Sequence, residues 1–230
     1  MGFFDRADRE GAGRPLPRRG PLRLLMISGT HFWKLIGANL LFVLFSLPVI
    51  TLPAALCALN RVCLLIYREG NCFLWMDFFR EFRRSFWRSL LPGALFGVLD
   101  FIGYFFMSLG AANGIYPVWC MIFWSVGIFS AAVGIVWGAY FFVLAALLDQ
   151  KNLGVLKNAF LLCMIRPGRA LAALAVVLGM FFIAMILMPV FIIALLLLWF
   201  SLMQTVICFL VSELAEQYIL YPIAEQENNR

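Results

Sequence analysis

Charged residues and histidine are scarce in this sequence of 230 residues. Only 13% of the residues are charged and the single histidine is His31, whereas about 25% of the residues of a soluble domain are charged. The chain has no HExxH, GxSxG or P-loop motif and no paired-carboxylate pattern, which would indicate metal, acyl-transfer or nucleotide chemistry. Its six cysteines are scattered without a CxxC pair. We therefore expect no enzyme, no cofactor or metal site, and no disulfide framework.

Apolar residues dominate the chain instead. They make up 64% of it and the mean hydropathy is +0.94. They occur in blocks of about 20 residues, the length that crosses about 30 Å of hydrocarbon. Backbone amides in lipid must be paired within the chain, and only helices appear as long continuous apolar runs. The sequence therefore predicts an all-α fold, a polytopic transmembrane helical bundle.

Six apolar runs predict about six spans, arranged as three hairpins. Prolines in the connections, Pro48 with Pro53, Pro117 and Pro189, break the helices and let the chain reverse. The predicted transmembrane domain covers residues 32–212, with spans near 33–52, 53–67, 90–112, 118–148, 170–188 and 190–211. The run at 53–67 is short enough to be a re-entrant or interfacial segment instead, so the second span stays open.

The basic residues predict which side each connection faces. With the N-terminus in the cytoplasm, every Lys and Arg falls in residues 1–32, 68–89, 149–169 or 212–230, except Arg61 and the boundary residue Lys34. The three outer turns then carry no charge, as the positive-inside rule requires. Topology thus accounts for the net charge of +6 without nucleic-acid binding. We expect a multi-pass membrane protein with both termini in the cytoplasm.

The two ends of the chain are more polar than its centre. Residues 1–31 are rich in arginine and proline without a helical period, which predicts a disordered basic cytoplasmic tail. A cleaved signal peptide is the alternative, but no A-x-A-like site follows the first apolar run. Residues 213–230 are predicted to form a cytoplasmic C-terminal tail.

Residues 73–89 predict an interfacial amphipathic helix on the cytoplasmic side. Its apolar face is aromatic: Trp75, Phe78, Phe79, Phe82 and Phe86. Three arginines recur at a spacing of four on the opposite face: Arg80, Arg84 and Arg88. Such a helix either anchors the chain parallel to the membrane or docks a cytoplasmic partner, and the sequence leaves both open.

Four polar side chains lie inside predicted spans at a similar depth, roughly 10–15 Å from the cytoplasmic edge at about 1.5 Å per residue. They are Asn39, Arg61, Asp100 and Gln204. A charge in hydrocarbon costs at least about 2.5–3.5 kcal/mol on insertion scales, so we expect Arg61 and Asp100 to contact each other. This polar layer is either a site for an ion or small solute or a buried clasp that fixes helix order.

Small residues recur at intervals of four in two predicted spans. Gly93 and Gly97 lie in one span, and Ser130, Gly134 and Gly138 in another. Such spacing permits close approach of helix backbones. We expect internal packing, with a homo-oligomer as the alternative.

Several short motifs occur in an order that resembles a bacterial family. They include Asn39 with Leu40 and Leu41, S-L-P-V-I-T at 46–51, A-A-L-C-A-L at 54–59, Asp77 with Phe78 and Phe79, and L-K-N-A-F-L-L at 156–162. This order resembles the YesL family of bacterial integral membrane proteins, a family with a domain of unknown function. The resemblance implies a place in the bacterial cytoplasmic membrane and an association with carbohydrate ABC uptake systems, without an established biochemical activity.

Two functions fit these features. The first is a non-enzymatic accessory or regulatory protein whose partners are the lipid bilayer and carbohydrate ABC transporter subunits. The second is a small solute transporter or channel that uses the intramembrane polar layer around Asp100. The first predicts a stable protein partner, whereas the second predicts stabilisation by a solute.

Overall fold

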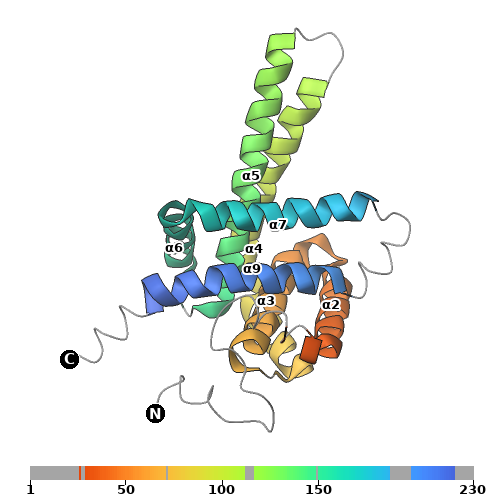
Figure 1. Ribbon diagram of the computed structural model, residues 1–230, viewed down its shortest axis with the longest axis vertical. Coiled ribbons are helices and arrows are strands. Elements are labelled where there is room, and N and C mark those ends of the chain that lie inside the picture. Colours follow the sequence, from red (N-terminus) through yellow and green to blue (C-terminus); the bar gives the residue numbers. More distant parts are fainter. Residues whose placement is uncertain are drawn as a thin grey trace, which may run out of the picture.

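The computed structural model describes residues 26, 29–70, 72–111, 117–148, 150–186 and 198–220. Every regular element in these residues is helical, which confirms the predicted all-α class (Figure 1). The elements are α2 (Phe32–Ser46), the 3-10 turn η1 (Val49–Thr51), α3 (Leu52–Glu69), α4 (Leu74–Ala111), α5 (Pro117–Leu147), α6 (Asn152–Ile165), α7 (Pro167–Ile186), α9 (Phe200–Ala215) and the π-helical turn η3 (Glu216–Leu220).

Three helical segments are long and apolar enough to cross a membrane: Val49–Glu69, Leu74–Ala111 and Val118–Leu147. Helices α6 and α7 together make a fourth if they form one broken span, although they are bent by 101° at their junction. Helix α2 has only 15 residues, fewer than a full crossing needs. Residues 187–197 of the last two predicted spans lie outside the described part of the chain. A membrane protein with three or four candidate spans is therefore supported, and six spans are not confirmed.

Helix α4 joins two segments that the sequence predicted as separate. The amphipathic segment 73–89 and the span 90–112 form one helix of 38 residues with Pro92 inside it. At 1.5 Å per residue this helix is about 57 Å long, nearly twice the hydrocarbon thickness. The amphipathic half therefore continues the axis of the apolar half, and the separate membrane-parallel helix is not observed.

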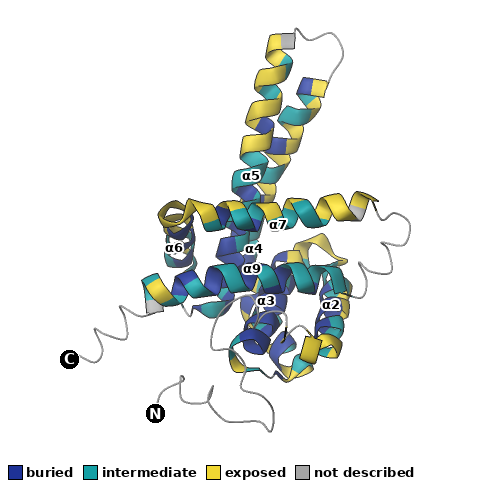
Figure 2. Ribbon diagram, viewed as in Figure 1, coloured by how far each residue is buried: buried dark blue, intermediate teal, exposed yellow. Residues whose placement is uncertain are grey.

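The apolar half of α4 and the first half of α5 form a hairpin that projects from the rest of the molecule (Figures 1 and 2). The two backbones touch at glycines, since a Cβ at Gly103 would lie 2.9 Å from the carbonyl oxygen of Gly127. Large apolar side chains cover the outside of this hairpin, among them the exposed Phe101, Tyr104, Met121 and Phe129. This surface is suited to lipid rather than water.

Helices α2 and α3 form a second hairpin, whose turn lies at the predicted Pro48–Pro53 connection. This hairpin lies beside the charged half of α4, because Pro53 contacts Gly93 and the Lys34 ammonium donates to the Cys72 carbonyl at 3.4 Å. Its turn therefore lies about 27 Å along α4 from Ala111, where the projecting hairpin turns. The two predicted outer turns are not at the same height.

Helix α9 crosses α2, α3, α5 and α7 and closes the core of this lower part of the molecule. Its C-terminal end carries ion pairs from Arg68 to Glu216 and from Arg169 to Glu213. The first residues of the predicted C-terminal tail are thus helical and bound, whereas residues 221–230 and all of 1–28 except Met26 lie outside the described residues. The ion pairs bring together three of the stretches predicted to be cytoplasmic.

Candidate functional site

Two of the four predicted polar residues, Asn39 and Gln204, are buried and contribute hydrogen bonds to the first half of α9, in a group of residues that we call the amide cluster. Asn39 lies on α2 and Gln204 on α9, and Asn60 from α3 completes the cluster. Asn39 Oδ1 accepts a hydrogen bond of 3.0 Å from the backbone N–H of Ser201, and the Gln204 amide donates to Asn60 Oδ1. Asn39, Asn60 and Ser201 have no exposed surface and Gln204 is 4% exposed. The cluster therefore ties three helices together through polar contacts.

Asn39 also satisfies a helix terminus. The N–H groups in the first turn of a helix have no partner within that helix, and Ser201 lies in the first turn of α9. The Asn39 oxygen supplies the missing acceptor from a neighbouring helix, and the Thr205 hydroxyl in turn donates to the Ser201 carbonyl at 2.7 Å. This contact fixes where α9 begins relative to α2.

Asn60 is the member of the cluster that sequence reasoning missed. Its Oδ1 also accepts from the Cys208 thiol at 3.4 Å, while its Nδ2 is buried without a hydrogen-bond partner. A signal was present in α9, where Ser201, Gln204, Thr205 and Cys208 recur at helical spacing and predict one polar face. Such a face requires polar groups on the helices it contacts.

Arg61 and Asp100 do not contact each other, so the predicted pair is wrong. The Arg61 guanidinium donates to the carbonyl of Ala146 at 3.1 Å. This carbonyl belongs to the last turn of α5, where free carbonyls and the helix dipole favour a cation. Arg61 therefore caps α5 instead of pairing with an acid.

The packing of α3 on α4 explains why the pair does not form. Helices α3 and α4 are antiparallel, and Pro53 contacts Gly93. Following each chain from this contact toward its C-terminal end therefore leads in opposite directions. Arg61 lies about 12 Å along α3 in one direction and Asp100 about 10 Å along α4 in the other. An axial separation of about 22 Å exceeds the reach of the two side chains.

Asp100 lies instead inside the projecting hairpin, against Gly134 of α5. The Cγ atom of Asp100 would be 3.2 Å from a Cβ at Gly134, so only glycine leaves room for the carboxyl group. Its Oδ1 is buried without a hydrogen-bond partner. One helical turn before Gly134 on α5, the Ser130 hydroxyl donates to the Leu99 carbonyl at 3.0 Å. The predicted four-residue layer is therefore one amide cluster and two separate sites.

The charged half of α4 turns a polar stripe inward that the sequence analysis did not identify. Asp77, Glu81, Ser85 and Ser89 recur at a spacing of four and are all buried. Asp77 Oδ2 accepts from the backbone N–H of Phe73 at 2.9 Å and so caps the helix start, and Ser85 donates to Glu81 at 2.7 Å. This stripe runs beside the buried Phe78, so the inner face of the helix is both polar and aromatic.

The three arginines predicted on the opposite face divide into two groups. Arg80 pairs with Asp77 at 2.6 Å and Arg84 approaches Glu81 at 3.8 Å, and both keep much of their surface exposed. Arg88 instead points into the protein, where its guanidinium donates to the Gln150 carbonyl. The expected single basic face is therefore limited to Arg80 and Arg84, together with the exposed Arg83.

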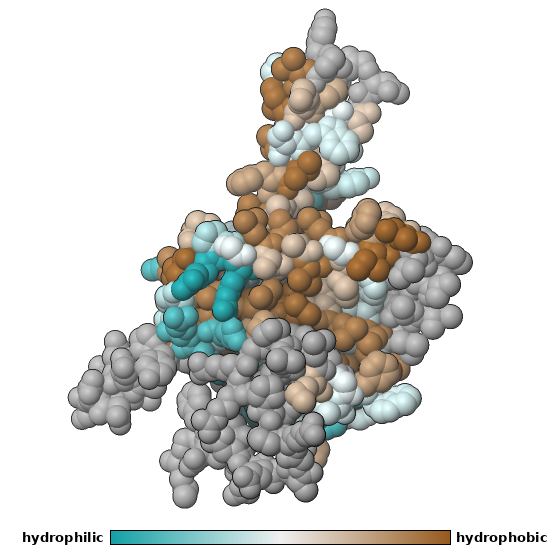
Figure 3. All heavy atoms as spheres, in the orientation of Figure 1, coloured by the Kyte–Doolittle hydropathy of each residue, from teal (hydrophilic) through white to brown (hydrophobic). Residues whose placement is uncertain are grey.

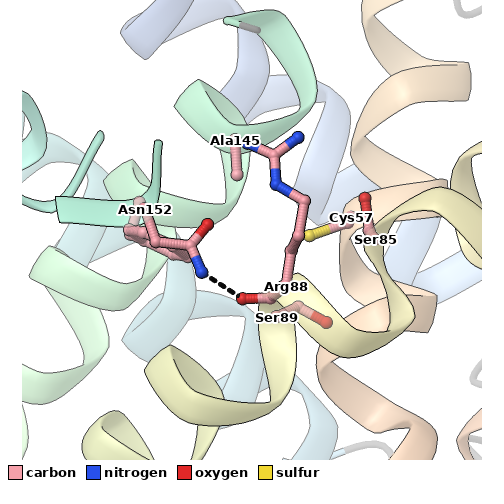
Figure 4. A pocket seen from close by; sticks show the side chains of 7 residues that line it. Cys57, Ser85, Arg88, Ser89, Ala145 and Asn152 are labelled. Atoms are coloured by element: carbon pink, nitrogen blue, oxygen red, sulfur yellow. Dashed lines mark hydrogen bonds between the residues drawn. The ribbon is translucent and has the colours of Figure 1, made fainter. Parts of the chain in front are cut away.

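Arg88, Pro92 and Asn152 form a clasp between α4 and the start of α6, and Figure 4 shows the hydrogen bond between Asn152 and Arg88. Proline has no N–H, so Pro92 leaves the carbonyl of the residue four positions earlier, Arg88, without its helical donor. The Asn152 amide replaces that donor with a hydrogen bond of 2.6 Å to the Arg88 carbonyl. Because Arg88 also donates to Gln150, the connection between α5 and α6 is held from both sides.

A small cavity with both polar and apolar lining lies beside this clasp (Figure 4). Its volume is about 10 Å³ and it is lined by Cys57, Ser85, Arg88, Ser89, Phe141, Ala145 and Asn152. A volume of this size holds about one water molecule. The cavity therefore suits a bridging water between buried hydroxyl and amide groups.

Among the residues that the structure describes, no group of three or more His, Cys, Asp or Glu side chains could hold a metal ion.

A segment in the N-terminal half of the chain resembles a known family. Residues 35–107 match a family described as "Protein of unknown function, DUF624". The matched segment runs from α2 through most of α4 and so includes Asn39, Asn60 and the inner stripe of α4. No curated protein and no solved structure matches the chain.

Proposed function

We propose that this chain is a non-enzymatic accessory or regulatory protein of the bacterial cytoplasmic membrane that acts by binding another membrane protein. The resemblance to the YesL family suggests subunits of a carbohydrate ABC transporter as that partner. The match to a family of unknown function is compatible with such a role and supplies no activity of its own.

The observation that carries this proposal is the outer face of the charged half of α4. Arg80, Arg83 and Arg84 are exposed there, and the large aromatic side chains of Trp75 and Trp87 flank them with 65% and 80% of their surface exposed. Exposed aromatic and arginine residues are enriched at the centres of protein interfaces. This face is therefore suited to a protein partner on the cytoplasmic side.

The buried polar residues support the same proposal in a different way. The amide cluster of Asn39, Asn60 and Gln204 forms hydrogen bonds within the protein, and Arg61 caps α5. Such contacts fix the order of helices, which is the role of a clasp. The polar core then provides a rigid support for the outer face of α4.

The test is affinity purification of the tagged protein from its native host in mild detergent, followed by mass spectrometry. Transporter subunits recovered above an unrelated membrane-protein control support the proposal. The triple change Arg80→Gln, Arg83→Gln and Arg84→Gln should abolish their recovery. A matched double change, Lys151→Gln with Lys157→Gln, removes exposed cations from another connection and should retain it. Equal recovery with both variants would place the contact elsewhere.

One observation favours the alternative of a small solute transporter or channel. Asp100 Oδ1 is buried in the projecting hairpin without a hydrogen-bond partner, and an ionisable group inside a membrane is a candidate transport site. This alternative predicts that a transported solute raises the unfolding temperature of the purified protein by mass action. The change Asp100→Asn should remove that shift while the protein remains folded. Purification without any partner, together with such a shift, would replace the accessory role by transport.

A further inference from the structure

The two hairpins of this protein are displaced along α4, so they cannot both occupy the same membrane layer in full. The turn of the α2–α3 hairpin lies beside Gly93, about 27 Å along α4 from the end of that helix at Ala111. Helix α3 consequently lies beside the half of α4 that contains Asp77, Arg80, Glu81, Arg83, Arg84 and Arg88. Placing α3 across the hydrocarbon would bring these charges to the same depth, which is costly.

The apolar half of α4 offers a better position for the bilayer. Residues 90–111 contain a single charged residue, Asp100, and about 20 residues cross the hydrocarbon. The paired first half of α5, up to about Val136, has no charged residue. Figure 3 shows apolar atoms over this hairpin and along α7, and hydrophilic atoms where α6, α7 and the C-terminal end of α9 meet.

The tip of the α2–α3 hairpin lies at the edge of this apolar layer. Its exposed side chains are apolar, with Leu47, Val49 and Ile50 exposed by 73%, 80% and 69%. They lie near Gly93 of α4. On α4, Gly93 follows Leu91 and lies about two turns beyond Trp87, and the side chains of Leu91 and Trp87 are also exposed. Tryptophan and apolar side chains at this position match the boundary between lipid headgroups and acyl chains.

Helix α7 extends the same boundary on another side of the molecule. It crosses α5 instead of running along it (Figure 1). Its third residue, Arg169, interacts electrostatically with Tyr140 of α5, one helical turn from Trp137, whose ring contacts Phe96 of α4 with centroids 5.6 Å apart. Its far end exposes Phe181, Phe182, Met185 and Ile186. An apolar helix that lies across the bundle axis at this height is placed to lie in the plane of one leaflet.

We propose that the α4–α5 hairpin crosses the bilayer and that two further elements, the α2–α3 tip and α7, lie in the interface of the cytoplasmic leaflet without crossing it. The tip penetrates about 5–10 Å into the boundary between headgroups and acyl chains, as amphipathic interfacial elements do. The exposed Arg80, Arg83 and Arg84 then lie on the headgroup side of Trp87. The exposed apolar side chains of the tip and of α7 contact lipid, because these side chains continue the lipid-facing surface of the α4–α5 hairpin.

This arrangement differs from six crossings at one residue in particular. In a six-span protein Ile50 lies in an outer turn, as does the region just before Val118. In the proposed arrangement Val118 lies near the outer surface and Ile50 lies in the cytoplasmic leaflet. The protein itself leaves the two residues exposed to a similar degree, 69% for Ile50 and 66% for Val118, so if both lay in outer turns a cysteine at either position would be equally reachable from outside.

The experiment uses the full-length protein in right-side-out membranes, with Cys120 replaced by serine because it is the one cysteine not buried in the protein among the six, all of which are described. Single changes Ile50→Cys, Val118→Cys and Arg83→Cys are treated with a membrane-impermeant maleimide from outside. The proposal expects labelling of Val118→Cys only. It also expects a fluorophore at Ile50→Cys, or at Phe182→Cys on α7, to be quenched by lipids spin-labelled near the headgroup and not by lipids labelled near the chain end.

External labelling of Ile50→Cys as fast as that of Val118→Cys would overturn the proposal, and so would external labelling of Arg83→Cys or absence of labelling at Val118→Cys. Deep quenching at position 50 or 182 would overturn it as well. If Ile50→Cys does not accumulate, Val49→Cys provides the same test, because Val49 is exposed in the same turn. None of these readouts depends on the identity of a protein partner.

Discussion

Removal of the Asn152 amide should destabilise the protein only as long as residue 92 is proline. The Arg88 carbonyl lacks a helical donor because Pro92 has no N–H, and the Asn152 amide donates to it at 2.6 Å. The change Asn152→Ala leaves this partly buried carbonyl without a partner, which costs about 1–3 kcal/mol. Since 1 kcal/mol corresponds to about 2–4 °C for a chain of this size, we expect a fall in unfolding temperature of about 2–12 °C.

The second change, Pro92→Ala, restores the N–H that the carbonyl lacks. In that background the helix supplies its own hydrogen bond, so the loss from Asn152→Ala should shrink to about 0.5 kcal/mol or less. Thermal unfolding of the four proteins in one detergent, followed by tryptophan fluorescence, completes the double-mutant cycle. The change Asn158→Ala, which removes a different amide bound to the Gln150 side chain at 3.1 Å, is the control and should cost the same in both backgrounds. Equal losses from Asn152→Ala in both backgrounds would refute the reasoning.

Three further predictions concern the hairpin, the amide cluster and Cys72. Gly103→Ala should lower the unfolding temperature through overpacking of about 1–3 kcal/mol, because its Cβ would meet the Gly127 carbonyl at 2.9 Å. The control Gly97→Ala, whose Cβ meets no described atom within 4 Å, should be neutral or stabilising. Equal effects of the two changes would contradict the close approach of α4 and α5. Gln204→Leu should cost about 1–3 kcal/mol and Asn60→Leu in addition should cost less than the sum, as measured by thermal unfolding, and strict additivity contradicts a shared cluster. Burial raises the pKa of the Cys72 thiol and Lys34 lowers it, so alkylation of Cys72, measured by mass spectrometry, should be slow at pH 7 and accelerate toward pH 9. Alkylation should be slower still in Lys34→Gln. An unchanged rate in that variant would contradict the assigned role of Lys34.

The local sequence predicted where the helices turn more successfully than it predicted how the helices are placed. The helical class, the turn between Pro48 and Pro53 and the start of α5 at Pro117 follow from apolar runs and proline chemistry. Asn39 and Gln204 were grouped by their expected depth in the membrane, and both side chains are buried. The helical class and the positions of the turns depend on residues close together in the chain, so they can be predicted from the sequence.

The predicted pair of Arg61 and Asp100 was wrong because all spans were assumed to begin at the same depth. Tertiary packing decides that depth, and the local sequence does not contain it. Counting residues from a shared membrane edge placed Arg61 beside Asp100, but the contact of Pro53 with Gly93 shifts the first hairpin toward the start of α4. Segments 73–89 and 90–112 were expected to be separate elements, whereas Asn152 supplies the donor that Pro92 lacks and α4 continues through both. A donor 64 residues distant in sequence from its acceptor cannot be assigned from local pattern.

The most direct test of this arrangement is a disulfide cross-link between α3 and α4. A Cβ at Gly93 would lie 2.7 Å from the Cβ of Pro53, which is shorter than the separation of about 3.5–4.5 Å found in disulfides, so the two backbones need only a small outward shift to accept the bond. With Cys57 and Cys120 replaced by alanine, Pro53→Cys with Gly93→Cys should form a disulfide on mild oxidation in native membranes. Pro53→Cys with Ala111→Cys should not, because Ala111 lies about 27 Å farther along α4. Cross-linking of position 53 to position 111 instead of to position 93 would place both hairpin turns at one height and contradict the account.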